Sequence, residues 1–310
     1  MNIAGVLLEQ MAALFLMMGL GFLLVKIRLL KSDDSHALSV ITIYIIGPAV
    51  ILKAFQIDFS DQVRDGFLLA LGAALLIHGL LFGICWLYGR ITPLRPVEKA
   101  SVIYSNAGNL IVPLVMSVLG DEWVIYASAF MCVQLFFIWS HGRILISGEK
   151  GVSVKKILLN ANLIAVLVGL TMLLLGWRLP TLLGNVCGQL SNTMGPVCML
   201  MLGMMLADVN WKEILGSRRT WLVVGLKMIA TPLIILFFLK LSHLPGLVEN
   251  GKTILYISFM AVMTPAATTV TQLAQMYRRD GPYASAINVM TTLVCIVTMP
   301  LLTWLYDLVM

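Results

Sequence analysis

The stretch YSNAGNLIVP, residues 104–113, places two asparagines, a glycine and a proline inside a long apolar segment. Pro113 lacks a backbone donor and crowds the carbonyl of Asn109, four residues earlier, while Gly108 adds backbone freedom. In hydrocarbon, unpaired backbone groups and polar side chains are costly. The stretch therefore predicts a helix that is interrupted near its middle, with polar side chains placed at the interruption for a purpose.

The composition of the chain places this stretch in a membrane. Of 310 residues, 60% are hydrophobic and 12% charged, whereas soluble domains are about 45–50% apolar and about a quarter charged. Apolar runs such as residues 5–25 are long enough to span a bilayer as helices and do not alternate as barrel strands do. We predict an all-α integral membrane protein with ten spans, near residues 4–25, 38–56, 67–88, 98–119, 123–142, 157–176, 188–207, 220–240, 253–276 and 283–305.

The basic residues predict the orientation of these spans. The first span contains Glu9 and has no basic residue before Lys26, so it is not a cleavable signal. Fifteen of the 21 lysines and arginines fall in loops after odd-numbered spans and five in loops after even-numbered spans. This bias puts the odd loops in the cytoplasm and both termini on the extracytoplasmic side of a multi-pass inner-membrane protein. Topology explains the net charge of +6, so we expect the lipid bilayer and no nucleic acid as a partner.

The two halves of the chain, 1–150 and 151–310, resemble each other. Similar residues recur at offsets of 148 to 157, in chain order. The pairs are 19–29 with 169–179, Gly47-Pro48 with Gly195-Pro196, Tyr104 and Pro113 with Tyr256 and Pro265, and YASA at 126–129 with YASA at 283–286. Each repeat has five helices, an odd number, so the second copy enters the membrane from the side opposite to the first. Such an inverted repeat is typical of secondary transporters with a site near the bilayer midplane. We therefore predict that spans four and nine are both broken, near Pro113 and Pro265, and cross at their breaks.

Polar residues near the two prolines are the candidate binding residues. They can satisfy backbone groups left open at the crossing or bind a solute, and half-helix N-termini there favour an anion. Lys227, the one basic residue well inside a span, either attracts a carboxylate or acts as a structural lock. The candidate set is Asn106, Gly108, Asn109, Pro113, Ser258, Thr264, Pro265, Thr268, Thr269 and Lys227.

Three segments resemble the auxin efflux carrier family, which includes plant auxin exporters and bacterial malonate or malate permeases. SNAGNLIVPL at 105–114 resembles the fourth-span motif of that family. NANLIAVLVGL at 160–170 is similar to its span-six opening, although Ala161 stands where proline is usual, and GPVCMLMLGMMLAD at 195–208 is similar to span seven. Lys227 and Pro232 fit a span-eight pattern of bacterial members. The resemblance covers essentially all ten spans.

The resemblance implies a fold shared with bile-acid symporters and sodium–proton antiporters. Spans one, two, six and seven would form a scaffold, and spans three to five and eight to ten a moving transport domain. We expect a permease for a small organic anion such as malonate, malate or an auxin-like carboxylate, coupled to a proton or sodium gradient or to neither. A homodimer is compatible with the small-residue helix faces.

Two other functions fit the sequence less well. A cation–proton antiporter prefers a carboxylate at the crossing, and residues 104–113 and 256–272 contain none. A membrane sensor or enzyme would carry a soluble domain or a polar catalytic cluster. The chain has no nucleotide-binding loop, metal-ligand pattern or nucleophile–base pair, so we expect neither an enzyme nor a cofactor or metal. The five cysteines lie in predicted spans and are interpreted as small apolar side chains.

Overall fold

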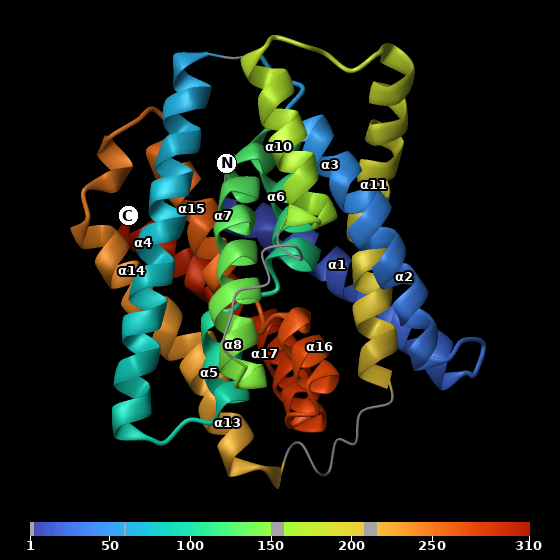
Figure 1. The fold of residues 1–310 in the computed structure, drawn as a ribbon, viewed down its shortest axis with the longest axis vertical. Coiled ribbons are helices and arrows are strands. Elements are labelled where there is room, and N and C mark those ends of the chain that lie inside the picture. The colour runs from blue at the N-terminus through green and yellow to red at the C-terminus, as the bar shows by residue number, and fades with distance from the viewer. Residues whose placement is uncertain (1–2, 59, 150–157, 208–215) are drawn as a thin grey trace. The chain divides into compact units, whose positions relative to one another are not determined.

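A computed structural model describes residues 3–58, 60–149, 158–207 and 216–310, which form helices joined by loops (Figure 1). Side chains are described from Ala12 onward, except those of Gly108 and Asn109. The chain divides into two compact units, and each unit is formed by segments that are distant in sequence. Unit 1 comprises Met1–Arg64, Gly108–Ser128 and Leu158–Val209, and unit 2 comprises Asp65–Ala107, Ala129–Ile157 and Asn210–Met310.

Unit 1 contains the helices of predicted spans one, two, six and seven together with the second part of span four. Its helices are α1 (Ile3–Lys26), η1 (Ser32–Asp34), α2 (Ser35–Ile41), η2 (Thr42–Ile46), α3 (Gly47–Ala54), α6 (Val112–Val118), η4 (Asp121–Trp123), α10 (Ala161–Leu174) and α11 (Thr181–Ala207). The first residues of α4, most of η3 and the first residues of α7 also belong to this unit.

Unit 2 contains most of α4 (Asp61–Ile91), the start of η3 (Ala107–Ile111) and the rest of α7 (Val124–Phe137). Its complete helices are α5 (Pro96–Ile103), η5 (Ile138–Gly142), α8 (Arg143–Ser147), α13 (Arg218–Gly225), η6 (Leu226–Ala230), α14 (Thr231–Leu241), η7 (Leu244–Gly246), α15 (Gly251–Met263), α16 (Thr268–Met276) and α17 (Gly281–Val309).

Six helical stretches in the described part of the chain are long and apolar enough to cross a membrane: 32–54, 61–91, 121–147, 181–207, 218–241 and 281–309. Shorter apolar helices cover Ala12–Lys26, Ala161–Leu174 and Gly251–Met263. An all-helical, multi-pass membrane protein is thus confirmed, and the count of ten spans stays a prediction.

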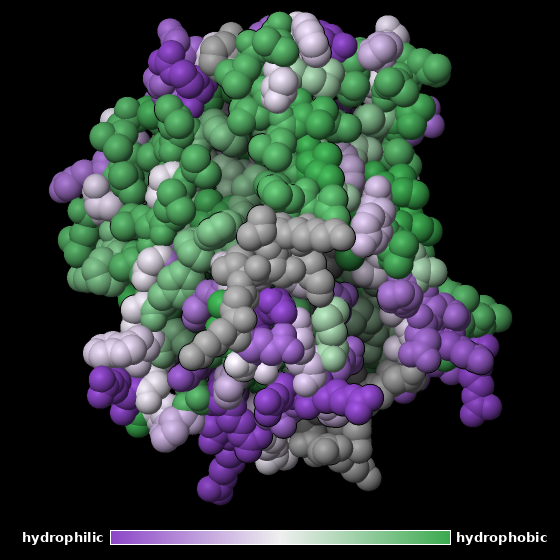
Figure 2. Space-filling view, viewed as in Figure 1, coloured by the Kyte–Doolittle hydropathy of each residue, from purple (hydrophilic) through white to green (hydrophobic). Residues whose placement is uncertain are grey.

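The surface of α4 shows why this chain needs a bilayer. One stripe of the helix, which includes Ala70, Ala74 and Ile77, is fully buried at the spacing of a helical face. The opposite face is also apolar, and Leu68, Leu75 and Trp86 are more than half exposed. Figure 2 shows hydrophobic side chains over most of the visible face, with hydrophilic ones gathered toward the end of unit 2 where α5 and α13 begin. A helix that is apolar on both faces has lipid as its solvent.

Unit 1 is built around a backbone-to-backbone crossing of α1 and α11. A Cβ atom added at Gly21 would lie 2.2 Å from the carbonyl oxygen of Leu200, and one added at Gly203 would lie 1.8 Å from that of Met18. Small residues allow this approach, and van der Waals packing is the main attraction between helices in lipid. The crossing makes α1 and α11 a rigid pair.

Unit 2 is organised around α15, which is buried on every side from Ile254 to Met263. It packs against α14 and α17, and the hydroxyls of Tyr256 and Tyr306 bond to Thr303 Oγ1 and to the carbonyl of Lys252. A helix surrounded on all sides by protein does not need an amphipathic pattern, which explains its uniformly apolar sequence.

Three of the π-helical turns in the described residues end two residues before a proline. They are η2 before Pro48, η3 before Pro113 and η6 before Pro232. A proline cannot donate to the helical ladder and crowds the carbonyl four residues earlier, and a wider turn relieves both problems without ending the helix. These prolines therefore lie within continuous helical segments.

Candidate functional site

Two chain breaks meet inside unit 2. Helix α5 ends at Ile103 and α15 ends at Met263, and Tyr104 and Thr264 both adopt extended backbone conformations. Ser105 and Ala266 form an isolated antiparallel bridge. The amide of Asn106 donates to the carbonyl of Pro265 at 2.8 Å, and the amide of Ala267 donates to the carbonyl of Tyr104 at 3.0 Å. Each break thus satisfies backbone groups of the other.

Side chains from two further helices complete this pairing. The carboxamide of Gln134, on α7, accepts from the amide of Ser105 at 3.0 Å and donates to its carbonyl at 2.8 Å. On α17, Thr291 Oγ1 accepts from the amide of Ala266 at 3.1 Å, and Asn288 Nδ2 donates to its carbonyl at 2.6 Å. Both outer edges of the two-residue bridge are therefore capped. We call Ser105, Ala266, Gln134, Asn288 and Thr291 the bridge cluster.

The break in the predicted fourth span does not lie at Pro113. It lies at Tyr104–Asn106, and Pro113 sits in the first turn of α6, directly after the π-helical turn that accommodates it. Pro265, in contrast, lies within its break, where its missing donor costs nothing. The pairing of Tyr104 with Tyr256 is wrong for the same reason, because Tyr104 is in a break and Tyr256 is in the middle of α15.

Lys227 lies in the π-helical turn η6 and is fully buried, with an exposed fraction of 0%. Its ammonium donates to Ser105 Oγ at 2.7 Å and to the carbonyl of Val102 at 3.4 Å. It therefore contacts the bridge cluster and the last turn of α5, as the structural-lock interpretation requires. Within the described part of unit 2, Lys227 forms no ion pair.

The other candidates differ in how much of their bonding capacity remains free. Asn106 is 3% exposed, and its Nδ2 has no protein partner; Ser258 Oγ, in α15, also has none. The hydroxyl of Thr264 already donates to the carbonyl of Ala261 at 2.8 Å. Thr268 and Thr269 form the partly exposed first turn of α16. The side chains of Asn109 and Glu9, and the surroundings of Gly108, lie outside the described part of the structure. Pro113 belongs to unit 1.

Lys227 and the donors at two helix starts make the crossing suited to an anion. Helix α16 begins at Thr268 with no side-chain cap, so its first N–H groups lack intrahelical acceptors. The turn η3 begins at Ala107, directly after the other break. Helix N-termini carry about half a positive charge each, and the ends of α5 and α15, which meet them here, about half a negative charge each. These helix-end charges balance, and the Lys227 ammonium remains. Residues 104–113 and 256–272 contain no acidic side chain to offset this charge.

Gln134, Asn288 and Thr291 were not predicted as site residues. A usable signal was nevertheless present, because Gln134 and Thr291 each lie eight residues after the first residue of a YASA repeat and are separated by the same offset of 157. A polar residue at equivalent positions of two apolar helices indicates a shared role. Asn288 has no such counterpart, since Met131 occupies the equivalent position.

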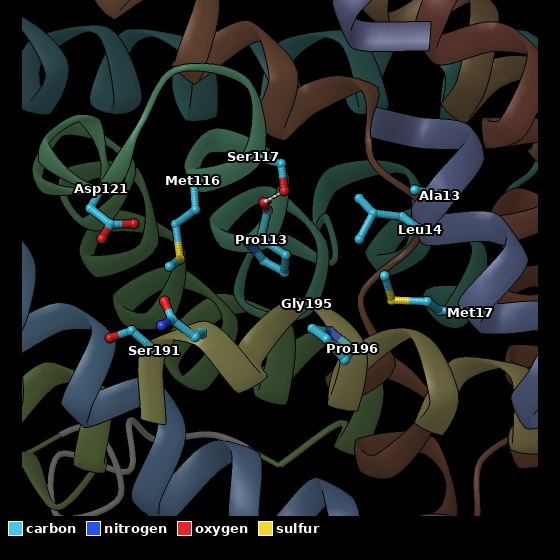
Figure 3. Close-up of a pocket in the computed structure, with 11 residues that line it drawn as sticks. Ala13, Leu14, Met17, Pro113, Met116, Ser117, Asp121, Ser191, Gly195 and Pro196 are labelled. Carbon is cyan, nitrogen blue, oxygen red and sulfur yellow. Dashed lines mark hydrogen bonds between the residues drawn. The ribbon is translucent and has the colours of Figure 1, made fainter. Parts of the chain in front are cut away.

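Unit 1 has a cavity of about 260 Å³ at the packing of α1, α6 and α11. Figure 3 shows Pro113 and Met116 of α6 opposite Ser191 and Pro196 of α11, with residues of α1 on another side. Its polar hydroxyls are bonded within their own helices, Ser117 to Pro113 and Ser191 to Cys187, and Asp121 pairs with Lys53. Pro113 therefore lines a different cavity from the site expected for it.

The described residues contain no group of three or more histidine, cysteine or acidic side chains that could hold a metal ion. His78 is buried against Phe130 and Phe137, with Nδ1 bonded to the carbonyl of Ala74 at 2.8 Å. His78 is thus an interior side chain.

Comparison with known proteins agrees with the resemblance inferred from the motifs. The model of the membrane transport protein family matches residues 6–155 and 149–303. A protein of Methanothermobacter thermautotrophicus described as an uncharacterized transporter is 26% identical over 308 residues, which cover 94% of this chain and 96% of that protein. The chain therefore belongs to the membrane transport protein family, the family of the auxin efflux carriers, and is a multi-pass membrane transporter.

Proposed function

We propose that the protein is a secondary carrier for a small organic anion, a mono- or dicarboxylate such as malonate, malate or an auxin-like acid. The observation that carries this proposal is the crossing in unit 2, where hydrogen-bond donors and positive helix ends converge without an acidic side chain. A carboxylate loses its hydration in such a place, and the donors replace the lost water contacts.

Asn106 and the first turn of α16 are the proposed carboxylate ligands. Asn106 Nδ2 is buried and has no protein partner, which is costly unless a ligand or water accepts from it. The N–H groups and hydroxyls of Thr268 and Thr269 provide further donors at a helix N-terminus, where anions bind readily. Gly108 and Asn109 remain candidates from the sequence alone.

The charge of the crossing argues against cation–proton exchange on this architecture. Such exchange needs a carboxylate that alternately holds a proton and a cation. In unit 2 the buried Glu98 lies at the N-terminus of α5, and it is bonded to Arg219 and Tyr283 rather than to the crossing. An organic anion is the better match.

Unit 2 is proposed to be the moving part of an elevator-type mechanism. Both breaks and all the side chains of the bridge cluster belong to it, so the crossing can move without losing its hydrogen bonds. Unit 1, with its rigid α1–α11 pair, is the proposed scaffold. We further propose the ten-span inverted repeat, both termini outside the inner membrane, and a homodimer built through the scaffold.

Ligand binding and uptake test the proposal together. Purified protein should be stabilised against heat by malonate, malate or indole-3-acetate and not by their uncharged amides. Proteoliposomes should accumulate the same labelled acid, and Asn106→Ala should lose both effects while the exposed-residue variant Gln272→Ala keeps them. No stabilisation and no uptake of any carboxylate, with the protein folded, would contradict the proposal.

A further inference from the structure

A lysine with no exposed surface needs an explanation in a membrane protein. Transferring an unpaired ammonium into an apolar interior costs far more than a folded protein can tolerate. Lys227 nevertheless lies at the crossing, held in a turn whose π-helical geometry is fixed by Pro232. Such a lysine either loses its proton or is held by ligands that stabilise its charge, so its ligands decide between the two.

The ligands of the Lys227 ammonium are oxygen atoms. Ser105 Oγ lies 2.7 Å from Nζ, and the carbonyl oxygen of Val102 lies 3.4 Å from it. Val102 is in the last turn of α5, whose end carries about half a negative charge because its final carbonyls lack helical partners. Backbone carbonyls, a hydroxyl and a helix C-terminus are also the groups that bind a monovalent cation in membrane carriers.

At the second break, the hydrogen bonds described at the end of α15 come from neutral side chains. There the end of α15 is satisfied by the Thr264 hydroxyl, which donates to the carbonyl of Ala261, and by the thiol of Cys295 at 4.0 Å from the carbonyl of Met263. Among the described hydrogen bonds at these two helix ends, those made by a cation are at the end of α5, and this cation is a side chain of the protein.

We infer that the Lys227 ammonium occupies a monovalent-cation site at the C-terminal end of α5 and acts as a built-in cation. Ser105 is the ligand that joins this site to the bridge cluster, because its hydroxyl binds Lys227 and its backbone binds Gln134. The ammonium fixes the end of α5 against the crossing, so no sodium ion is needed at this place. The consequence for transport, sodium-independent uptake, rests on the proposed function; the site itself does not.

Chemical rescue tests the site without any organic substrate. Lys227→Ala removes three methylenes and the ammonium, a group of the size of propylammonium. The variant should melt well below the wild type and should regain at least half of the lost melting temperature in propylammonium chloride or NaCl. Propanol, which has the same shape without charge, and choline, which is too large, should have no effect. Lys240→Ala, an exposed lysine on α14, is the matched control and should behave as the wild type.

A second variant keeps the test decisive where Lys227→Ala folds poorly. Lys227→Met fills the vacated space without a charge, so it should be destabilised and should not respond to any cation. The melting temperature of the wild type should be equal in NaCl, KCl and choline chloride at the same ionic strength. Specific stabilisation of the wild type by sodium, or an equal loss in Lys227→Ala and Lys227→Met with no cation response in either, overturns the inference. Rescue without any carboxylate-induced stabilisation would instead contradict only the proposed function.

Discussion

The two breaks at the crossing have the same backbone pairing and different chemistry. Ser105 and Ala266 face each other in one antiparallel bridge, and each has its amide and carbonyl capped by a side chain of a neighbouring helix. At Ser105 the carboxamide of Gln134 caps both groups. At Ala266 the hydroxyl of Thr291 caps the amide and the carboxamide of Asn288 caps the carbonyl. The buried Lys227 makes its described hydrogen bonds on the Ser105 side.

This difference separates the requirements of folding from those of function. Two breaks buried in a membrane protein must each satisfy their backbone groups, which gives both the same caps. Nothing in that requirement calls for a charge, an unpartnered carboxamide or an uncapped helix start. Those features are unequal between the two breaks, and we assign them to ligand recognition and to the built-in cation.

The largest expected effect is that of Gln134→Ala, because one side chain serves both backbone groups of Ser105. The variant leaves the buried amide of Ser105 unpaired and removes one of two partners from its carbonyl, which also accepts from the amide of Ala107. The loss of both bonds should cost about 2–4 kcal/mol in the free energy of unfolding. Equilibrium unfolding in mixed detergent micelles measures this change. The exposed Gln272→Ala should change it by less than about 0.5 kcal/mol. Equal effects of the two variants would show that the caps are not needed.

Asn288→Ala should have a smaller effect, since it removes a single cap from the carbonyl of Ala266. We expect a loss of about 1–3 kcal/mol in the same unfolding measurement. If Asn288→Ala were more damaging than Gln134→Ala, the order of importance of the two breaks would be reversed.

Thr291→Val isolates the capping of the Ala266 amide with almost no change of shape. The expected loss is about 1–2 kcal/mol. Thr298→Val, on the same helix, removes only a bond of Thr298 to the carbonyl of Val294 and should be nearly neutral. The difference in unfolding free energy between these two variants measures the cap itself.

Asn106→Ala should have the smallest effect on stability, because its Nδ2 bonds to no protein atom. The unfolding free energy should change by less than about 1 kcal/mol or rise, since an unpaired buried donor is removed. The stabilisation by a carboxylate ligand should nevertheless disappear in a thermal-shift titration. Loss of stability with retained ligand response would place Asn106 in the fold rather than in the site.

Part of the site could be predicted from residue patterns. The polar stretch 104–113 contains the first break, at its N-terminal end. Pro265 located the other, because a residue without an amide hydrogen tolerates a chain break. The position of the first break was predicted too late in the chain. A π-helical turn absorbed Pro113, and the helix opened at Tyr104–Asn106 instead, where Gln134 and the second break provide partners.

The sequence by itself determined the membrane environment, the family and the region in which both interruptions fall, because hydropathy and turn chemistry are local properties of the chain. Tertiary structure decided which backbone groups face each other, which side chains cap them and what surrounds Lys227. These choices depend on contacts between residues more than 100 positions apart, such as Lys227 with Ser105 and Ala267 with Tyr104. A buried polar group is tolerated only where such a distant partner lies within hydrogen-bonding distance.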